Sequence, residues 1–189
     1  MFKGLETAKR GAELVRLWDE VGALAKWLPE TEAAMLDGRR AVIDKLGDPD
    51  PILITAFISD DPTASLSRLK CSNAEIKRAA SISKNQVWPD TNESATVRRW
   101  MSGAYEVVDD LVAISVASGR GKGLEAAVDE QRKEDVPLSI ADLAVDGTDL
   151  IAHGVPRGPA IGKTLARLLG EVLKNPALNT REQLLDLIS

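Results

Sequence analysis

Residues 143–173 read LAVDGTDLIAHGVPRGPAIGKTLARLLGEVL, and this stretch decides the fold class. Two apolar patterns of helical spacing flank a turn that begins at Gly154. Asp146 or Thr148 can cap the first predicted helix, and Gly154 suits the left-handed residue that commonly follows a helix. Pro159 suits the first turn of the next helix, where its missing N–H has no cost. The stretch therefore predicts a helix, a tight turn and a second helix.

The second of these helices is expected to bury one face. Its apolar residues recur at spacings of one, three and four, which places them on a single stripe of a helix. They are Ile161, Leu165, Leu168, Leu169 and Val172. Asn175-Pro176 ends the pattern, because the residue before a proline disfavours helical geometry.

The remaining apolar and capping patterns predict more helices and no sheet. The expected helices cover residues 14–28, 31–46, 51–59, 72–84, 95–101, 105–117 and 124–133, with others beginning at Asp61-Pro62 and at Asn179, whose partner in the cap is Glu182. The β-branched residues of segment 51–59 (PILITAFIS) also suit a buried strand, but no second strand candidate is present to pair with it. The predicted fold class is all-α. A multi-helix body over residues 1–135 is followed by a small helical tail over residues 136–189, with a linker near residues 129–139.

Glycine, proline and aspartate fall at fixed offsets in the tail. The segments are VDGTDLI (145–151), Gly154, GPAIG (158–162) and NTREQLL (179–185). In these residues the sequence resembles the tail of tRNA nucleotidyltransferases, the family of CCA-adding enzymes and bacterial poly(A) polymerases whose C-terminal half is entirely helical. Weaker similarity to the family lies in RLKCSNAE (68–75) and WLPE (27–30).

The resemblance implies that the chain is the body and tail of such a protein. In the family these parts hold tRNA while a catalytic head adds nucleotides to its 3′ end. Mg²⁺ and CTP or ATP are implied only for the head, which is expected to be absent from this chain, so no cofactor is expected here. The alternative is a helical protein-interaction module that kept the fold without binding RNA, and the net charge of −5 favours it.

No catalytic residue is predicted. The family carries an Asp-x-Asp on a sheet after a Gly-Ser segment, whereas Asp48-Pro49-Asp50 lies in a proline-bracketed turn. Glu134-Asp135 lacks the arginine of the family's base-selecting Glu-Asp-x-x-Arg motif. GPAIGKT (158–164) is one residue too short for a phosphate-binding P-loop and follows a predicted helix instead of a strand. The hypothesis of a nucleotide-hydrolysing enzyme rests on this incomplete motif alone. No activity is expected for this chain by itself.

Composition excludes several kinds of site and segment. One histidine and one cysteine exclude a zinc site of the usual ligands and an internal disulfide. No apolar run approaches the length of a membrane span, and charges near Met1 do not fit a signal peptide. The sequence therefore predicts a cytoplasmic protein with no membrane partner.

Basic residues concentrate in the middle of the chain. Residues 66–122 hold 9 basic and 6 acidic residues, whereas both flanks are acidic. Arg98 and Arg99 beside Trp100 suit phosphate contact and base stacking. The alternative is that Trp100 is a core residue and that the two arginines are its solvated neighbours. The helix start at 158–164 offers N–H groups to a phosphate, with a purely structural turn as the alternative. The predicted RNA-binding residues are Lys77, Arg78, Lys84, Arg98, Arg99, Trp100, Arg120, Lys122, Arg157, Gly158, Gly162 and Lys163.

Overall fold

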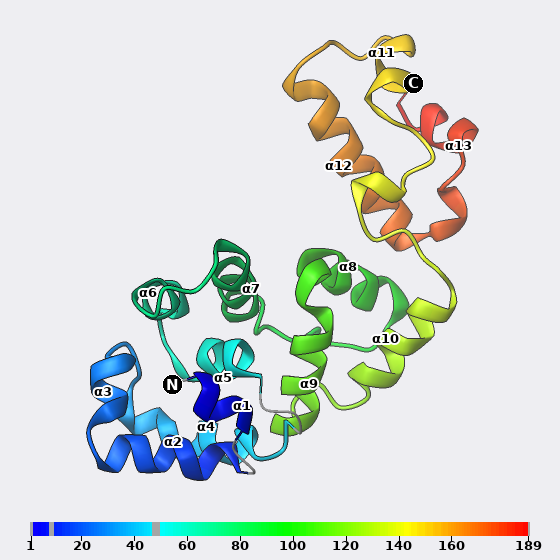
Figure 1. The fold of residues 1–189 in the computed structure, drawn as a ribbon. Coiled ribbons are helices and arrows are strands. Elements are labelled where there is room, and N and C mark those ends of the chain that lie inside the picture. Colours follow the sequence, from blue (N-terminus) through cyan, green and yellow to red (C-terminus); the bar gives the residue numbers. More distant parts are fainter. Residues whose placement is uncertain (1, 8–9, 47–49, 189) are drawn as a thin grey trace. The chain divides into compact units, whose positions relative to one another are not determined.

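The computed structural model describes residues 2–7, 10–46 and 50–188, and within these ranges it contains helices and no strand (Figure 1). The predicted all-α class is therefore confirmed. The α-helices are α1 (Phe2–Thr7), α2 (Gly11–Glu20), α3 (Ala23–Trp27), α4 (Ala33–Ile43), α5 (Pro51–Ile58), α6 (Pro62–Arg68), α7 (Asn73–Lys84), α8 (Ser94–Ala104), α9 (Val108–Ser118), α10 (Leu124–Lys133), α11 (Gly147–Ala152), α12 (Pro159–Lys174) and α13 (Arg181–Asp186). Short 3-10 helices are η1 (Tyr105–Val107), η2 (Ile140–Asp142) and η3 (Pro176–Leu178).

Packing divides the chain into two compact units. Unit 1 comprises Met1–Trp88 and Glu106–Lys122, and unit 2 comprises Pro89–Tyr105 and Gly123–Ser189. The chain thus contributes α8 to unit 2 before it returns to unit 1 with α9. The domain boundary between residues 135 and 136 stays a prediction, since these units are defined by packing alone.

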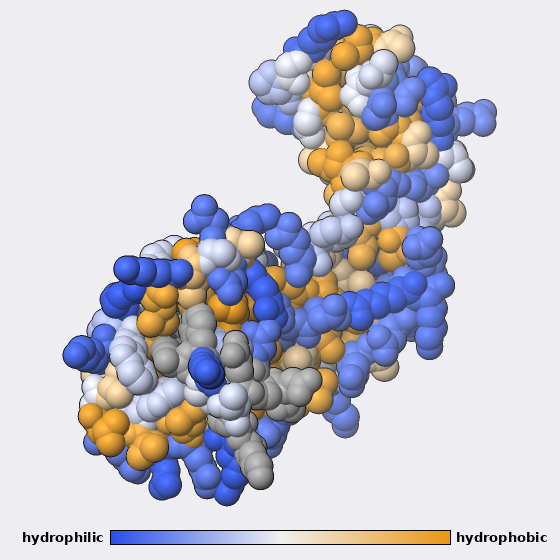
Figure 2. Space-filling model, viewed as in Figure 1, coloured by the Kyte–Doolittle hydropathy of each residue, from blue (hydrophilic) through white to orange (hydrophobic). Residues whose placement is uncertain are grey.

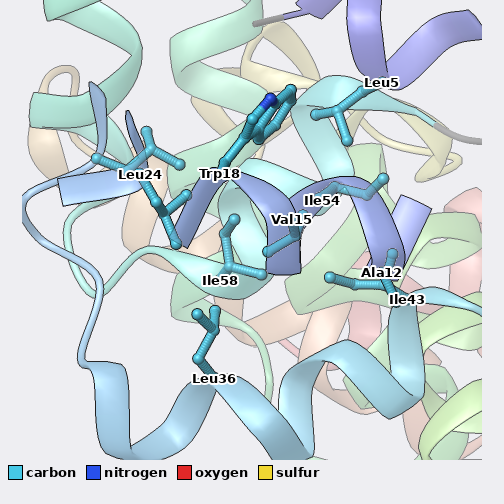
Figure 3. Close-up of a cluster of buried hydrophobic side chains, with 10 residues drawn as sticks. Leu5, Ala12, Val15, Trp18, Leu24, Leu36, Ile43, Ile54 and Ile58 are labelled. Carbon is cyan, nitrogen blue, oxygen red and sulfur yellow. The ribbon is translucent and has the colours of Figure 1, made fainter. Parts of the chain in front are cut away.

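Helix α5 forms part of the core of unit 1. Six of its eight residues are buried, which is the pattern of a helix covered on all sides. The Asp50 carboxylate begins the helix by accepting the backbone N–H groups of Ile52 at 2.8 Å and Leu53 at 3.0 Å. Figure 3 shows Ile54 and Ile58 of α5 among the buried side chains of α1, α2, α3 and α4. The helical interpretation of segment 51–59 is confirmed.

The single helix predicted over residues 14–28 is wrong in one respect. Gly22 adopts a left-handed conformation with φ of 71°, so the segment forms two helices, α2 and α3. Trp18 and Trp27 then meet edge to face, with ring centroids 5.4 Å apart and planes at 84°. Trp18 is 8% exposed and belongs to the core of unit 1. Gly47, which follows the expected helix over residues 31–46, lies outside the described residues.

In unit 2 the stretch 143–173 forms the predicted helix, turn and helix. Asp146 caps α11 by accepting the N–H groups of Thr148 at 2.7 Å and Asp149 at 3.0 Å. Gly154 has a φ of 97°, and Pro159 occupies the first turn of α12. The stripe of α12 packs on α11 and α13 in an apolar cluster of buried Val145, Leu150, Leu168, Val172 and Leu184.

The start of α13 differs from the prediction. Thr180, and not Asn179, caps this helix through its hydroxyl, which accepts the backbone N–H of Gln183 at 3.3 Å. The Asn179 amide instead spans two segments: it accepts the N–H of Ala144 at 2.8 Å and donates to the carbonyl of Asp142 at 2.9 Å. Its role is tertiary, so a local capping pattern could not reveal it.

We expect Asn179→Ala and Thr180→Ala each to lower the free energy of unfolding by about 1 kcal/mol, the usual effect of losing a cap or a hydrogen bond. Glu182→Ala is the matched control, because no described residue pairs with the Glu182 side chain. Urea unfolding followed by circular dichroism measures all three variants. A loss in Glu182→Ala as large as in Asn179→Ala would support the original capping prediction instead.

Hydrophilic side chains cover much of the face drawn in Figure 2, with apolar side chains among them. Exposed large apolar residues include Leu17, Val21 and Val87. In the described ranges, no helix is long and apolar enough to span a membrane.

Candidate RNA-binding surface

Arg98 does not lie on a surface, contrary to the sequence-based expectation. It is 6% exposed, and its guanidinium donates to the carbonyl of Leu173 at 2.7 Å, to the carbonyl of Lys174 at 3.0 Å and to the Gln131 Oε1 at 2.8 Å. The two carbonyls belong to the last turn of α12, where backbone acceptors lack helical partners and the helix dipole favours a cation. Arg98 therefore joins α8 to α10 and α12.

Arg78 also has a structural role. Its guanidinium binds the Asp110 carboxylate of α9 through two hydrogen bonds and pairs with Asp50 at 2.7 Å. Burial by itself raises the pKa of Asp50, but the N–H of Leu53 and the guanidinium of Arg78 outweigh it and hold that pKa below its ordinary value. Lys77, the residue before Arg78, pairs with Glu106 at 2.9 Å on the surface. Neither cation is available without breaking an ion pair.

A further ion pair joins the two weaker similarity segments, WLPE and RLKCSNAE. The Arg68 guanidinium binds the Glu30 carboxylate through two hydrogen bonds and reaches the carbonyl of Trp27 at 3.2 Å. The Ser65 hydroxyl donates to the same carboxylate at 2.9 Å. Hydrogen bonding by Arg68, which outweighs burial, lowers the pKa of Glu30 to about 2. These segments hold α3 to α6 within unit 1.

The Glu30 pKa predicts a pH dependence of stability. Because it lies below the ordinary value of 4.5, the pair stabilises the fold fully above about pH 5 and loses this contribution as pH falls toward 2. We therefore expect the melting temperatures of wild type and Glu30→Gln to differ most at pH 6 and to converge below pH 4. Glu32→Gln is the control. A wild-type advantage over Glu30→Gln that is the same at pH 6 and pH 3 would contradict this.

Five predicted cations remain exposed and have no ion pair or side-chain hydrogen bond among the described residues: Lys84, Arg99, Arg120, Arg157 and Lys163. Lys122 is exposed as well. Unit 1 carries Lys84, Arg120 and Lys122, and unit 2 carries the others. Trp100 is half-buried, between the two alternatives of core and stacking platform.

The start of α12 is open. Gly158, Gly162 and the neighbouring Arg157 and Lys163 are all exposed. Gly158 precedes the helix with a φ of 104°, which a residue with a side chain rarely adopts. The element before α12 is the helix α11, whereas a P-loop follows a β-strand. The arrangement offers the positive end of a helix and two nearby cations.

Of the carboxylates compared with the family's catalytic motifs, Asp50, Glu134 and Asp135 lie among the described residues. Asp50 is used as a cap and in an ion pair, while Asp48 and Pro49 lie outside the described residues. Glu134 ends α10, and Asp135 follows with a φ of 48°. Across ranges 2–7, 10–46 and 50–188, no three His, Cys, Asp or Glu side chains gather in a way that could hold a metal ion.

Comparison with known families agrees with the pattern in the tail. The family model of tRNA nucleotidyltransferase domain 2 matches residues 52–188, which is well over half of the chain. The chain belongs to the tRNA nucleotidyltransferase family. The match begins inside α5 and extends beyond α13, so the family domain includes residues of both units. No curated protein and no solved structure matches the chain.

No sequence pattern marked one pocket of unit 1. This pocket of about 490 Å³ is lined by α4, α5 and α9 and by residues at and after the end of α7, from Met35 to Arg120. Only Arg120 among its lining residues belongs to the predicted RNA-binding set. Its members are separated by up to 85 positions in the chain, so only folding brings them together.

Proposed function

We propose that this chain holds tRNA, or a similar RNA, for 3′-end nucleotide addition by a catalytic head that is not part of it. The observation that carries the proposal is the family match over residues 52–188. The exposed cations support it, since phosphate contacts supply most of the affinity of a protein for a nucleic acid backbone.

The proposed contacts are fewer than the sequence suggested. Arg98 and Arg78 are used inside their units, and Lys77 is paired. The proposed contact set is therefore Lys84, Arg99, Arg120, Lys122, Arg157 and Lys163, with Trp100 as a stacking residue and Gly158 and Gly162 at the α12 start. Each unit contributes cations to this set.

Salt and charge removal test the proposal. We expect tRNA affinity of the full chain to fall by roughly a hundredfold or more between 50 and 200 mM salt, because several phosphate contacts release counterions. Arg99→Gln/Arg157→Gln/Lys163→Gln should flatten the dependence of log affinity on log salt by about 0.9 for each lost contact. Filter binding or gel shift with tRNA measures both effects.

The matched control is Lys26→Gln/Lys45→Gln, which removes exposed cations outside the proposed set. It should leave the salt slope within error of wild type. No tRNA binding by wild type at 50 mM salt would overturn the proposal and favour the protein-interaction module. Equal slopes for the triple variant and wild type would remove the unit 2 cations from the contact set.

We also expect the chain alone to add no CMP or AMP to tRNA in the presence of Mg²⁺. Nucleotidyl transfer needs carboxylates that hold Mg²⁺ ions at the reacting phosphates, and Asp50 is engaged by Arg78 and two backbone N–H groups. Incorporation of radiolabelled nucleotide is the measurement. Incorporation above background that Asp50→Asn abolishes would place Asp50 in an active site and overturn this expectation.

A further inference from the structure

The pocket of unit 1 is lined mainly by polar groups and cations, and an apolar wall forms the smaller part of its surface. Met35, Val42, Phe57 and Ile114 supply apolar surface, and Trp88 adds an indole. Hydroxyl and amide groups come from Ser59, Ser83, Ser118 and Gln86. A volume of about 490 Å³ lies in the range of small-molecule sites.

The charges that line the pocket do not cancel. Its charged residues are Arg39, Asp60 and Arg120. Arg39 donates to the Asp60 carboxylate at 2.8 Å and to the carbonyl of Ile58, so this cation and this anion neutralise each other. The guanidinium of Arg120 has no described partner. The pocket therefore carries one uncompensated positive charge and suits an anionic ligand.

The backbone of Arg120 is fixed. Gly119 ends α9 in a left-handed conformation with φ of 68°. The N–H of Arg120 then donates to the carbonyl of Ser115 at 3.0 Å, and the buried Ser115 hydroxyl donates back to the carbonyl of Arg120. The side chain thus projects from a fixed position of the loop, which lowers the entropy lost when it binds an anion.

We propose that this pocket binds one unpaired nucleotide of RNA, its base against the apolar wall and Trp88, and its phosphate on Arg120. A flat aromatic base suits an apolar wall with polar groups at its edges. A phosphodiester carries the single negative charge that Arg120 would neutralise, and guanidinium groups bind phosphate oxygens well. The inference deepens the proposed function, because it assigns a single-stranded segment of the RNA to unit 1.

The test uses nucleoside monophosphates and the full chain. In ¹⁵N-labelled protein, AMP should shift the Trp88 indole signal, which Trp88→Phe identifies among the four tryptophans. Titration gives the affinity for AMP, for adenosine and for inorganic phosphate. We expect AMP to bind more tightly than either fragment. If adenosine bound as tightly as AMP, Arg120 would have no part in recognition. If inorganic phosphate bound as tightly as AMP, the pocket would be a simple anion site. Either result overturns the proposal.

Variants give an independent check. Arg120→Gln should weaken AMP binding by about tenfold or more, since it removes a charge-assisted contact. Lys45→Gln, an exposed lysine of unit 1 that does not line the pocket, should change it less than about twofold. Ser83→Phe adds bulk to the pocket without changing its charge and should weaken the AMP-dependent shift of Trp88. Circular dichroism confirms that each variant is folded.

Failure of this inference is distinguishable from failure of the proposed function. tRNA binding without any AMP-dependent shift of Trp88 overturns the pocket assignment alone. AMP binding without tRNA binding overturns the proposed function and leaves a nucleotide site. An acidic peptide that shifts Trp88 as strongly as AMP, and competes with it, would assign the pocket to a protein partner and overturn the nucleotide proposal.

Discussion

Replacing Arg98 by methionine is expected to lower the free energy of unfolding by about 3 to 5 kcal/mol. The buried guanidinium satisfies three acceptors, the carbonyls of Leu173 and Lys174 and the Gln131 side chain. Methionine keeps much of the volume but leaves these acceptors without a donor, and each unsatisfied buried polar group costs roughly 1 to 3 kcal/mol. Urea unfolding followed by circular dichroism measures the loss.

Two further variants separate the hydrogen bonds from the charge. Arg99→Met, at the exposed neighbouring position, should change stability by less than about 0.5 kcal/mol. Arg98→Lys should recover little, because one ammonium cannot reproduce the planar fork that reaches all three acceptors. If Arg98→Met were as stable as Arg99→Met, the contacts of α8 with α10 and α12 would not depend on the guanidinium.

Leu168→Ala should lower the free energy of unfolding by about 2 to 5 kcal/mol, the usual range for a leucine truncated in a core. Leu168 is 0% exposed and lies in the apolar cluster that joins α11, α12 and α13. Helices α11 and α13 are not expected to be stable alone, since they have six residues each. Urea unfolding, with backbone hydrogen exchange of α11 and α13, measures the loss.

The matched control for this variant is Leu187→Ala. Leu187 follows α13 and is 37% exposed, so its truncation leaves no internal cavity and should cost less than about 1 kcal/mol. If Leu168→Ala destabilised no more than Leu187→Ala, the packing of α11 and α13 would not rest on the stripe of α12.

Local signals predicted much of this fold because their physics is local. The capping box of Ser72 and Glu75, the cap of Asp146 and the conformation of Gly154 involve atoms within a few residues of one another. The apolar stripe of α12 likewise follows from helical periodicity alone. The buried segment 51–59 also forms a helix as predicted, since a strand needs a partner strand and the sequence offers none.

Errors arose where a residue's partner lies far away in the sequence. Arg98 has the same local surroundings as Arg99, yet it donates to acceptors 33 to 76 positions away. Asn179 suits the cap position of a helix, but its amide binds the backbone of Ala144 and Asp142, which lie 35 and 37 positions before it. The error at Gly22 has a local cause instead. This glycine adopts a left-handed conformation within an otherwise periodic pattern, and that conformation splits a predicted helix in two.

The sequence by itself determined the helical class and the family, because periodicity, caps and the spacing of glycine, proline and aspartate are properties of neighbouring residues. Only the tertiary structure decided which cations are exposed and which are used in the fold. It also assembled the pocket of unit 1 from α4, α5, α9 and the segment that follows α7. The physical reason is that burial and ion pairing depend on contacts between distant segments, which form only when the helices pack.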